Sequence, residues 1–171
     1  LQYDFMLQSF GLVRMNLLKE PVYKRPSFYA VSHAVALLNS ETEPFSGVGV
    51  KESKGTEIKS VGIAKGGKCV GVAYWRGDDK PSDILDKDKV NALIQGVVFE
   101  NPALVDPITG RVYDLSYVML RGGQQRLENA TKFTGLPLWD SPLIIIEKNA
   151  FDWTACQLPE GYVPFVDHVG I

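Results

Sequence analysis

The sequence predicts a mainly β protein, an antiparallel β-sandwich of about eight strands preceded by a short strand and helix segment. Three observations support this fold class. After Pro44, short apolar runs alternate with turn residues, at about eight to twelve residues per strand. Before Pro44, one stretch repeats apolar residues at helical spacing. Apolar residues make up 45% of the 171 residues, which is enough for a sizeable core.

Composition and charge argue against two classes of partner. The net charge is -2, from 18 basic and 20 acidic residues that are spread along the chain. A nucleic-acid-binding stripe or a polybasic membrane anchor would need a block of like charge, which the sequence lacks. The sequence also contains no run of about 18 apolar residues, which is the length needed to span a bilayer. We therefore expect neither a nucleic-acid nor a membrane partner. The chain begins at Leu1 without a signal-peptide pattern, which we interpret as a processed product or an excised segment.

Residues 1–43 are expected to form an N-terminal segment, and residues 44–171 the β-sandwich domain. The first ten residues are mostly apolar and aromatic, which predicts a buried segment. A short strand is predicted within residues 12–16. Pro21 and Pro26 are expected to bracket a loop.

One amphipathic helix is predicted from residue 26 or 27 to residue 38. Its apolar positions Phe28, Val31, Val35 and Leu38 recur at helical spacing, and its alanines favour helix formation. Pro26 suits the first turn, where its missing N–H costs nothing. A helix so rich in small apolar residues should pack tightly against another element.

Eight strands are expected in the sandwich domain. They comprise residues 47–51, 58–65, 69–76, 90–100, 103–106, 111–115, 127–133 and 143–147. Gly66-Gly67 separates the second strand from the third and predicts a two-residue hairpin turn with positive φ. The third strand is apolar through most of its length and should be central in its sheet. The tail from residue 151 is expected to wrap over the sandwich or against the N-terminal segment.

No catalytic constellation or metal site is predicted. His33 and His168 lack a nucleophile signature such as G-x-S-x-G, so we interpret His33 as a surface or core residue of the helix. Asp106 and Asp140 each adjoin a proline-containing turn, and we favour capping of backbone N–H groups over acid catalysis. The aspartate-rich residues 77–89 lack the central glycine and terminal glutamate of a calcium loop. We therefore expect no metal and no cofactor.

The two cysteines, Cys69 and Cys156, lie far apart and have no metal-ligand spacing. They could form one disulfide or remain two buried thiols, and we favour the free thiols. Asn129-Ala130-Thr131 is an N-glycosylation sequon, which matters only in a eukaryotic secretory context.

Four aromatic residues are candidates for carbohydrate binding, because an aromatic ring can stack on the C–H face of a sugar. They are Tyr74, Trp75, Trp139 and Trp153. Tyr74 and Trp75 are neighbours on one strand, so they should point to opposite faces, with only one of them in the core. Packing in a core or a domain interface is the favoured role for each of the four taken singly.

Several motifs resemble those of glycoside hydrolases whose catalytic (β/α)8 barrel is followed by a β-sandwich. Residues 10–13, FGLV, and 24–31, KRPSFYAV, resemble the last barrel strand and the start of the next helix, where FGL precedes KP-x-[YF]-Y-A. In this chain an arginine stands where the family has its lysine, and a lysine lies one position earlier. Three further motifs resemble those of the accessory sandwich: AYW at residues 73–75, DPITGRVYDL at 106–115 and LPLWDSP at 136–142.

This resemblance covers about residues 1–148 and implies a C-terminal segment of a glycoside hydrolase, with no activity expected for this chain alone. The parent's catalytic glutamates would lie upstream of Leu1, because a barrel needs about 200 or more residues. The implied partners are the catalytic barrel, which the sandwich would buttress, and a polysaccharide or oligosaccharide. The resemblance also favours an extracellular or periplasmic location.

Two other functions stay open: a stand-alone carbohydrate-binding module, and a structural or adhesion sandwich that binds protein. The predicted helix discriminates among them, because a barrel must have a last helix whereas a sandwich module does not need one. If Phe28, Val31 and Val35 packed against the sandwich and left no open apolar face, the barrel hypothesis would weaken. A large exposed apolar patch near residues 1–10 would support it.

Overall fold

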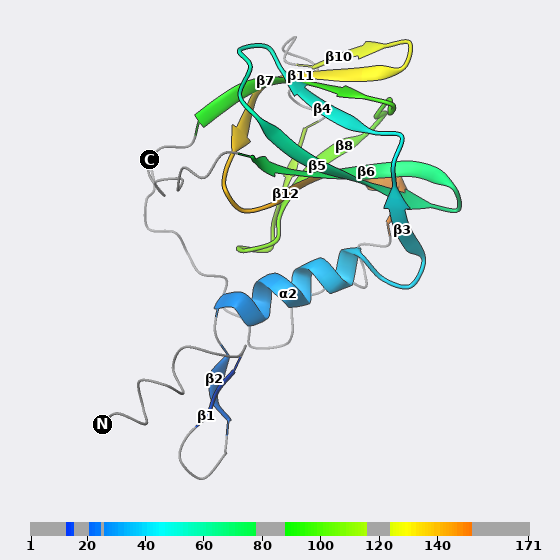
Figure 1. Ribbon diagram of the computed structural model, residues 1–171. Coiled ribbons are helices and arrows are strands. Elements are labelled where there is room, and N and C mark those ends of the chain that lie inside the picture. Colours follow the sequence, from blue (N-terminus) through cyan, green and yellow to red (C-terminus); the bar gives the residue numbers. More distant parts are fainter. Residues whose placement is uncertain (1–12, 16–20, 25, 78–87, 116–123, 152–171) are drawn as a thin grey trace.

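The predicted β-sandwich is confirmed. The computed structural model describes residues 13–15, 21–24, 26–77, 88–115 and 124–151. In this part of the chain, two antiparallel sheets of six and four strands pack face to face. Helix α2 lies along the outer side of the larger sheet, and a two-stranded hairpin lies beyond the helix (Figure 1).

The N-terminal elements are strand β1 (Val13–Met15), strand β2 (Pro21–Lys24) and helix α2 (Pro26–Leu37). Strand β1 and the helix match their predictions, the helix to within one residue. The expected loop between Pro21 and Pro26 is wrong, because β2 pairs antiparallel with β1. Proline begins β2, and the first position of a strand tolerates its missing N–H.

The six-stranded sheet has the strand order β3-β5-β6-β12-β8-β9, and all of its neighbours are antiparallel. Its strands are β3 (Thr42–Phe45), β5 (Ile58–Lys65), β6 (Lys68–Arg76), β12 (Leu143–Glu147), β8 (Pro102–Asp106) and β9 (Arg111–Asp114). Gly66 and Gly67 adopt φ angles of 58° and 73°, which confirms the predicted turn. Strand β3 was not predicted, because Pro44 indicated a break. As an edge strand, β3 needs no N–H at that residue on its open side.

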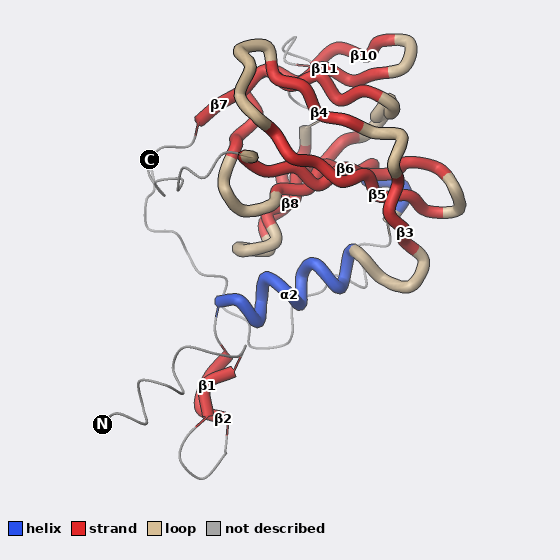
Figure 2. The backbone as a smooth tube through the Cα atoms, viewed as in Figure 1, coloured by secondary structure: helices blue, strands red, loops and turns tan. Residues whose placement is uncertain are grey.

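The four-stranded sheet has the strand order β10-β11-β7-β4. Its strands are β10 (Gln124–Leu127), β11 (Ala130–Leu138), β7 (Asp88–Gln95) and β4 (Gly49–Glu52). The single strand expected over residues 127–133 is wrong, because Leu127 pairs with Ala130 and a two-residue turn separates β10 from β11. The strand expected to reach residue 100 ends at Gln95, where Gly96 turns the chain with a φ of 88°. Figure 2 shows how loops join the strands of the two sheets.

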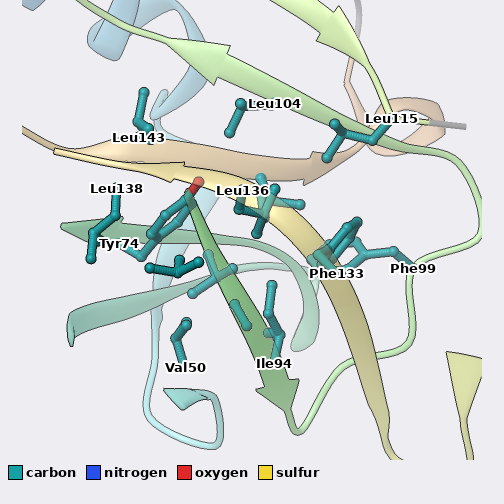
Figure 3. Packing of buried hydrophobic residues seen from close by; sticks show 14 of the residues in the cluster. Val50, Tyr74, Ile94, Phe99, Leu104, Leu115, Phe133, Leu136, Leu138 and Leu143 are labelled. Atoms are coloured by element: carbon teal, nitrogen blue, oxygen red, sulfur yellow. The ribbon is translucent and has the colours of Figure 1, made fainter. Parts of the chain in front are cut away.

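The main core fills the space between the two sheets (Figure 3). It is built from alternate residues of facing strands, as the period of two in a strand requires. Its members are Val50, Val72, Tyr74, Val90, Ala92, Ile94, Val97, Phe99, Leu104, Leu115, Phe133, Leu136, Leu138, Leu143 and Ile145. A second cluster, here called the outer cluster, lies on the other side of the six-stranded sheet. It comprises Leu37, Ile63, Val70, Ala103, Val105, Ile144 and Ile146.

The connection between β7 and β8, residues 96–101, carries the chain from one sheet to the other. The buried Thr131 hydroxyl accepts a hydrogen bond from Phe99 N–H at 3.0 Å and donates one to Val97 O at 3.1 Å. The Glu147 carboxylate accepts the N–H groups of Glu100 and Asn101 at 2.7 and 3.0 Å. Side chains from both sheets therefore satisfy the polar backbone groups of this connection.

Some sequence predictions concern parts of the chain outside the described residues. They are the buried segment 1–10, the fold of the tail beyond residue 151, the aspartate-rich residues 78–87, Trp153, Cys156 and His168.

Candidate docking surface on helix α2

Helix α2 is held on the sandwich by two side chains one helical turn apart. Leu37 is only 3% exposed and belongs to the outer cluster, together with Ile63 and Ile144. His33 lies over the turn between β8 and β9, with its Nδ1 2.9 Å from Pro107 O. At this distance the ring nitrogen and the carbonyl oxygen form a hydrogen bond when Nδ1 carries the proton. The interpretation of His33 as a structural residue of the helix therefore fits its contacts.

The turn beneath His33 is shaped by Asp106 and Gly110. The carboxylate of Asp106 accepts hydrogen bonds from Ile108 N–H at 2.9 Å and from the Thr109 hydroxyl at 2.7 Å. This confirms the predicted capping role, and Asp106 is 2% exposed. Gly110 has a φ of 70°, and a Cβ at this position would come within 2.6 Å of the His33 ring. Because Gly110 has no side chain, the His33 ring can lie directly against the backbone of this turn.

The opposite side of the helix is apolar and open. Val31, Val35 and Leu38 are 45%, 61% and 42% exposed. Leu38 N–H bonds to Ala34 O at 2.7 Å, so the helical turn extends through Leu38. The spacing of four and three residues places the three side chains on one face, and we call them the docking stripe.

No charged residue interrupts this surface. The sequence contains no Asp, Glu, Lys or Arg between Arg25 and Glu41. Single exposed apolar residues are ordinary on protein surfaces, but a helix in contact with water normally carries charged residues on its outer face. A charge-free helix with a row of aliphatic side chains facing outward is typical of an interface.

Strand β6 carries two of the carbohydrate-binding candidates, Tyr74 and Trp75, and Tyr74 lies inside the protein. Its ring is 1% exposed in the main core, and its hydroxyl donates a hydrogen bond to Pro137 O at 3.0 Å. Burial raises the pKa of this hydroxyl above its usual value, so it stays protonated. Tyr74 therefore presents no ring face to a sugar. Trp75 is partly exposed and points to the opposite side, as alternation along a strand requires.

The remaining tryptophan candidates do not extend Trp75 into a larger platform among the described residues. Trp139 packs against the main core, and its carbonyl accepts Arg76 N–H at 2.6 Å. Trp139 therefore lies near β6, but its side chain packs on the inner side of the sheet, whereas the side chain of Trp75 faces the outer side. Trp153 is outside the described residues.

Other chemistry is sparse in the part of the chain that the structure describes. No cluster of three or more His, Cys, Asp or Glu side chains has the arrangement of a metal site there. Asp140 is exposed at the bend between β11 and β12. The Cys69 thiol is half-buried and free, and desolvation raises its pKa despite opposing hydrogen bonds to the backbone. Within the same residues, no helix has the length and apolar character needed to traverse a lipid bilayer.

Sequence reasoning identified the apolar residues of the helix but not the direction in which they point. Phe28, Val31, Val35 and Leu38 formed the predicted stripe, yet the buried Leu37 and the ring of His33, neither of them in that stripe, contact the sandwich. A helix without charges gives no polar face from which the buried side could have been read.

Comparisons with known proteins return no relative. No protein-family model, no curated protein and no solved structure matches the chain. The fold and the surface define a β-sandwich domain that carries an apolar helix on its outer side.

Proposed function

We propose that this chain is a non-catalytic C-terminal accessory segment of a glycoside hydrolase, and that it buttresses the catalytic (β/α)8 barrel through helix α2. The observation that carries the proposal is the docking stripe. Val31 and Val35 are 45% and 61% exposed, whereas Phe28 is partly buried, so the helix keeps an open apolar face, as the barrel hypothesis requires. Two sequence motifs lie close to this helix. The motif that resembles the barrel's last strand, residues 10–13, precedes it, and the motif that resembles the start of the barrel's last helix, residues 24–31, overlaps it.

The size of the docking stripe favours a partner on the same polypeptide. Fully burying a valine or leucine contributes about 1.5–3 kcal/mol. The three side chains are already about half covered, so complete burial would add about 3 kcal/mol. A separate protein partner at micromolar affinity needs about 8 kcal/mol. A tethered barrel has a high effective concentration and needs much less, which makes an adhesion function the weaker alternative.

The first test is the coding sequence upstream of Leu1, which should encode a barrel of about 200 or more residues. In that longer polypeptide, Val35→Asp should destabilise the enzyme by about 2–4 kcal/mol, because the carboxylate would be buried against the barrel. In the isolated chain the same change should cost less than about 0.5 kcal/mol, because Val35 is exposed there. Thermal unfolding of both proteins measures the difference.

The matched control for Val35→Asp is Leu127→Asp. Leu127 is also exposed, at 47%, but lies on β10 of the other sheet. It should have the same small effect in both proteins. An upstream sequence without a barrel, or equal effects of Val35→Asp in the two proteins, would refute the proposed function.

A separate prediction concerns carbohydrate. Among the carbohydrate candidates that the structure describes, Trp75 alone is partly exposed on the outer side, and Tyr74 lies inside the core. We therefore expect no stacking platform from these candidates and hence weak binding at most. In affinity electrophoresis through polysaccharide gels, the isolated chain should migrate without retardation. Retardation that Trp75→Ala abolishes and Trp139→Ala leaves intact would instead identify a carbohydrate-binding module.

A further inference from the structure

Strand β9 forms an edge of the six-stranded sheet. In the part of the chain that the structure describes, β8 is its only neighbour, and the two strands pair without a bulge. Natural sheets usually protect an edge with a proline, a lysine or a bulge, because an open edge pairs readily with other strands. The opposite edge strand, β3, carries Pro44. Strand β9, with the sequence RVYD, contains neither a proline nor a lysine.

The backbone of β9 directs the hydrogen-bonding groups of two residues away from the protein. Leu115, the residue after β9, donates its N–H to Pro102 O at 3.0 Å and so faces β8. In an antiparallel pair, every second residue of a strand turns its N–H and C=O toward the same neighbour. Tyr113 therefore also faces β8, whereas Val112 and Asp114 direct their N–H and C=O groups to the open side of the strand.

The side chains of β9 include two large apolar groups that are about half exposed. Val112 is 46% exposed and lies opposite Val105 of the outer cluster. Tyr113 is 45% exposed and lies opposite Leu104 of the main core. Val105 and Leu104 have a strand on both sides and are only 3% and 5% exposed. A further strand beside β9 would cover Val112 on the outer side and Tyr113 on the inner side in the same way.

From these features we infer that β9 pairs with β9 of a second copy of this chain and forms a symmetric dimer. Antiparallel pairing about a twofold axis at Tyr113 places Val112 of each copy opposite Asp114 of the other. All the outward N–H and C=O groups of these two residues then have partners. The two Tyr113 side chains lie opposite each other at a non-hydrogen-bonded position, where side chains approach most closely. Aromatic pairs are among the favourable pairs across strands.

The other symmetric registers are less complete. An axis at Val112 would place Asp114 opposite Gly110, whose N–H already donates to Asp106 O at 2.8 Å. The Asp114 carbonyl would then lack a donor. An axis at Asp114 would place two carboxylates directly opposite each other, which is unfavourable. The axis at Tyr113 is therefore the register that satisfies the edge.

The charged residues of β9 agree with this register. Arg111 lies opposite Leu115 of the second copy, so no like charges oppose each other across the interface. The Asp114 carboxylate is paired within its own chain with Lys148 Nζ at 2.6 Å. Lys148 begins the short helix η1 (Lys148–Ala150) after β12. The negative charge of Asp114 is thus balanced before the second copy binds.

Disulfide cross-linking of the 171-residue chain tests the dimer. In a background without the native thiols (Cys69→Ser, Cys156→Ser), Tyr113→Cys should form a disulfide-linked dimer when oxidised glutathione is the oxidant. The closest pairs of an antiparallel ladder suit disulfide geometry. The matched control is Val61→Cys, which is 46% exposed but lies on the interior strand β5. We expect Tyr113→Cys to cross-link at least about tenfold faster, because pairing raises the effective concentration of its thiol.

Two further cysteine variants in the same background test the register. Val112→Cys alone should cross-link slowly, because the residue opposite it is Asp114. A mixture of Val112→Cys and Asp114→Cys should instead give mainly the mixed dimer, which peptide mass mapping identifies. A preference of Val112→Cys for itself would refute the register with the axis at Tyr113.

Sedimentation equilibrium of the unsubstituted chain measures the dimer without cross-links. An interface of one short strand pair belongs to the weak class, so we expect the average mass to rise toward that of two chains between about 10 and 500 µM. Val112→Pro removes an N–H that points away from β8 and blocks strand addition, so this variant should stay monomeric and keep its unfolding midpoint. Val112→Thr, which keeps the N–H and the branched side chain, is the matched control and should still dimerise.

The inference is overturned when the unsubstituted chain stays monomeric over that range, or when Tyr113→Cys cross-links no faster than Val61→Cys. A dimer that Val112→Pro leaves intact would also refute it, and its loss in Val35→Asp would place the interface on helix α2 instead. If Val112→Pro lowers the unfolding midpoint, the cysteine variants decide alone. None of these results depends on the proposed barrel, because each is measured on this chain by itself.

Discussion

Replacing Gly96 with alanine is expected to destabilise the protein by about 3–5 kcal/mol. Gly96 has a φ of 88°, a conformation that costs a residue with a side chain about 1 kcal/mol or more. A Cβ at this position would also overlap the backbone carbonyl of Gly47, in the connection between β3 and β4. The two connections between the sheets would have to move apart, and the lost packing supplies the rest of the cost. Chemical unfolding followed by fluorescence measures the change.

Gly66→Ala is the matched control for Gly96→Ala. Gly66 also has a positive φ, 58°, but no atom lies within 4 Å of a Cβ placed there. It should therefore show only the conformational cost, about 1 kcal/mol. Equal destabilisation by the two substitutions would show that the close approach of Gly96 to Gly47 contributes nothing.

Thr131→Val is expected to lower the free energy of unfolding by about 2–4 kcal/mol. Valine has nearly the same shape, so the packing around this fully buried residue would change little. The substitution removes the hydroxyl that bonds Phe99 N–H and Val97 O. Each buried backbone group left without a partner costs about 1–3 kcal/mol. Thermal or denaturant unfolding measures the effect.

The conservative variant Thr131→Ser separates the hydrogen bonds from the packing. Serine keeps the hydroxyl and loses one methyl group, so it should cost about 1 kcal/mol. A larger loss for serine than for valine would mean that the methyl group, and not the hydroxyl, holds the connection between the sheets in place.

Most strands could be predicted because a two-sided sheet leaves a clear pattern in the sequence. Strand β5 has the predicted bounds, and β6 differs by one residue at its start. The missed elements have two opposite causes: a residue that usually signals a break lies within a strand, or a turn lacks its usual signal. Pro44 sits on the edge strand β3, and the turn at Glu128 and Asn129 lacks the glycine that usually marks a two-residue hairpin.

The candidate surface was predictable only in part. Helical spacing identified the apolar residues of α2, and the absence of charge between Arg25 and Glu41 can be read directly. The choice of His33 and Leu37 as the contacts to the sandwich depends on the position of the β8–β9 turn, about seventy residues later. Tertiary packing of this kind leaves no periodic signal. The positions of Trp75 and Trp139 on different sides of the sheet likewise depend on strand pairing.

The strand order of the larger sheet has a consequence for synthesis on the ribosome. Strand β12 lies between β6 and β8, so it joins two parts of the sheet that are made earlier. Until residues 143–147 leave the ribosome, β6 and β8 each lack their shared neighbour. Contacts between segments so distant in sequence form slowly, and unpaired strand edges bind other chains. The nascent domain should therefore depend on chaperones until β12 emerges, and a chain that ends before β12 should aggregate.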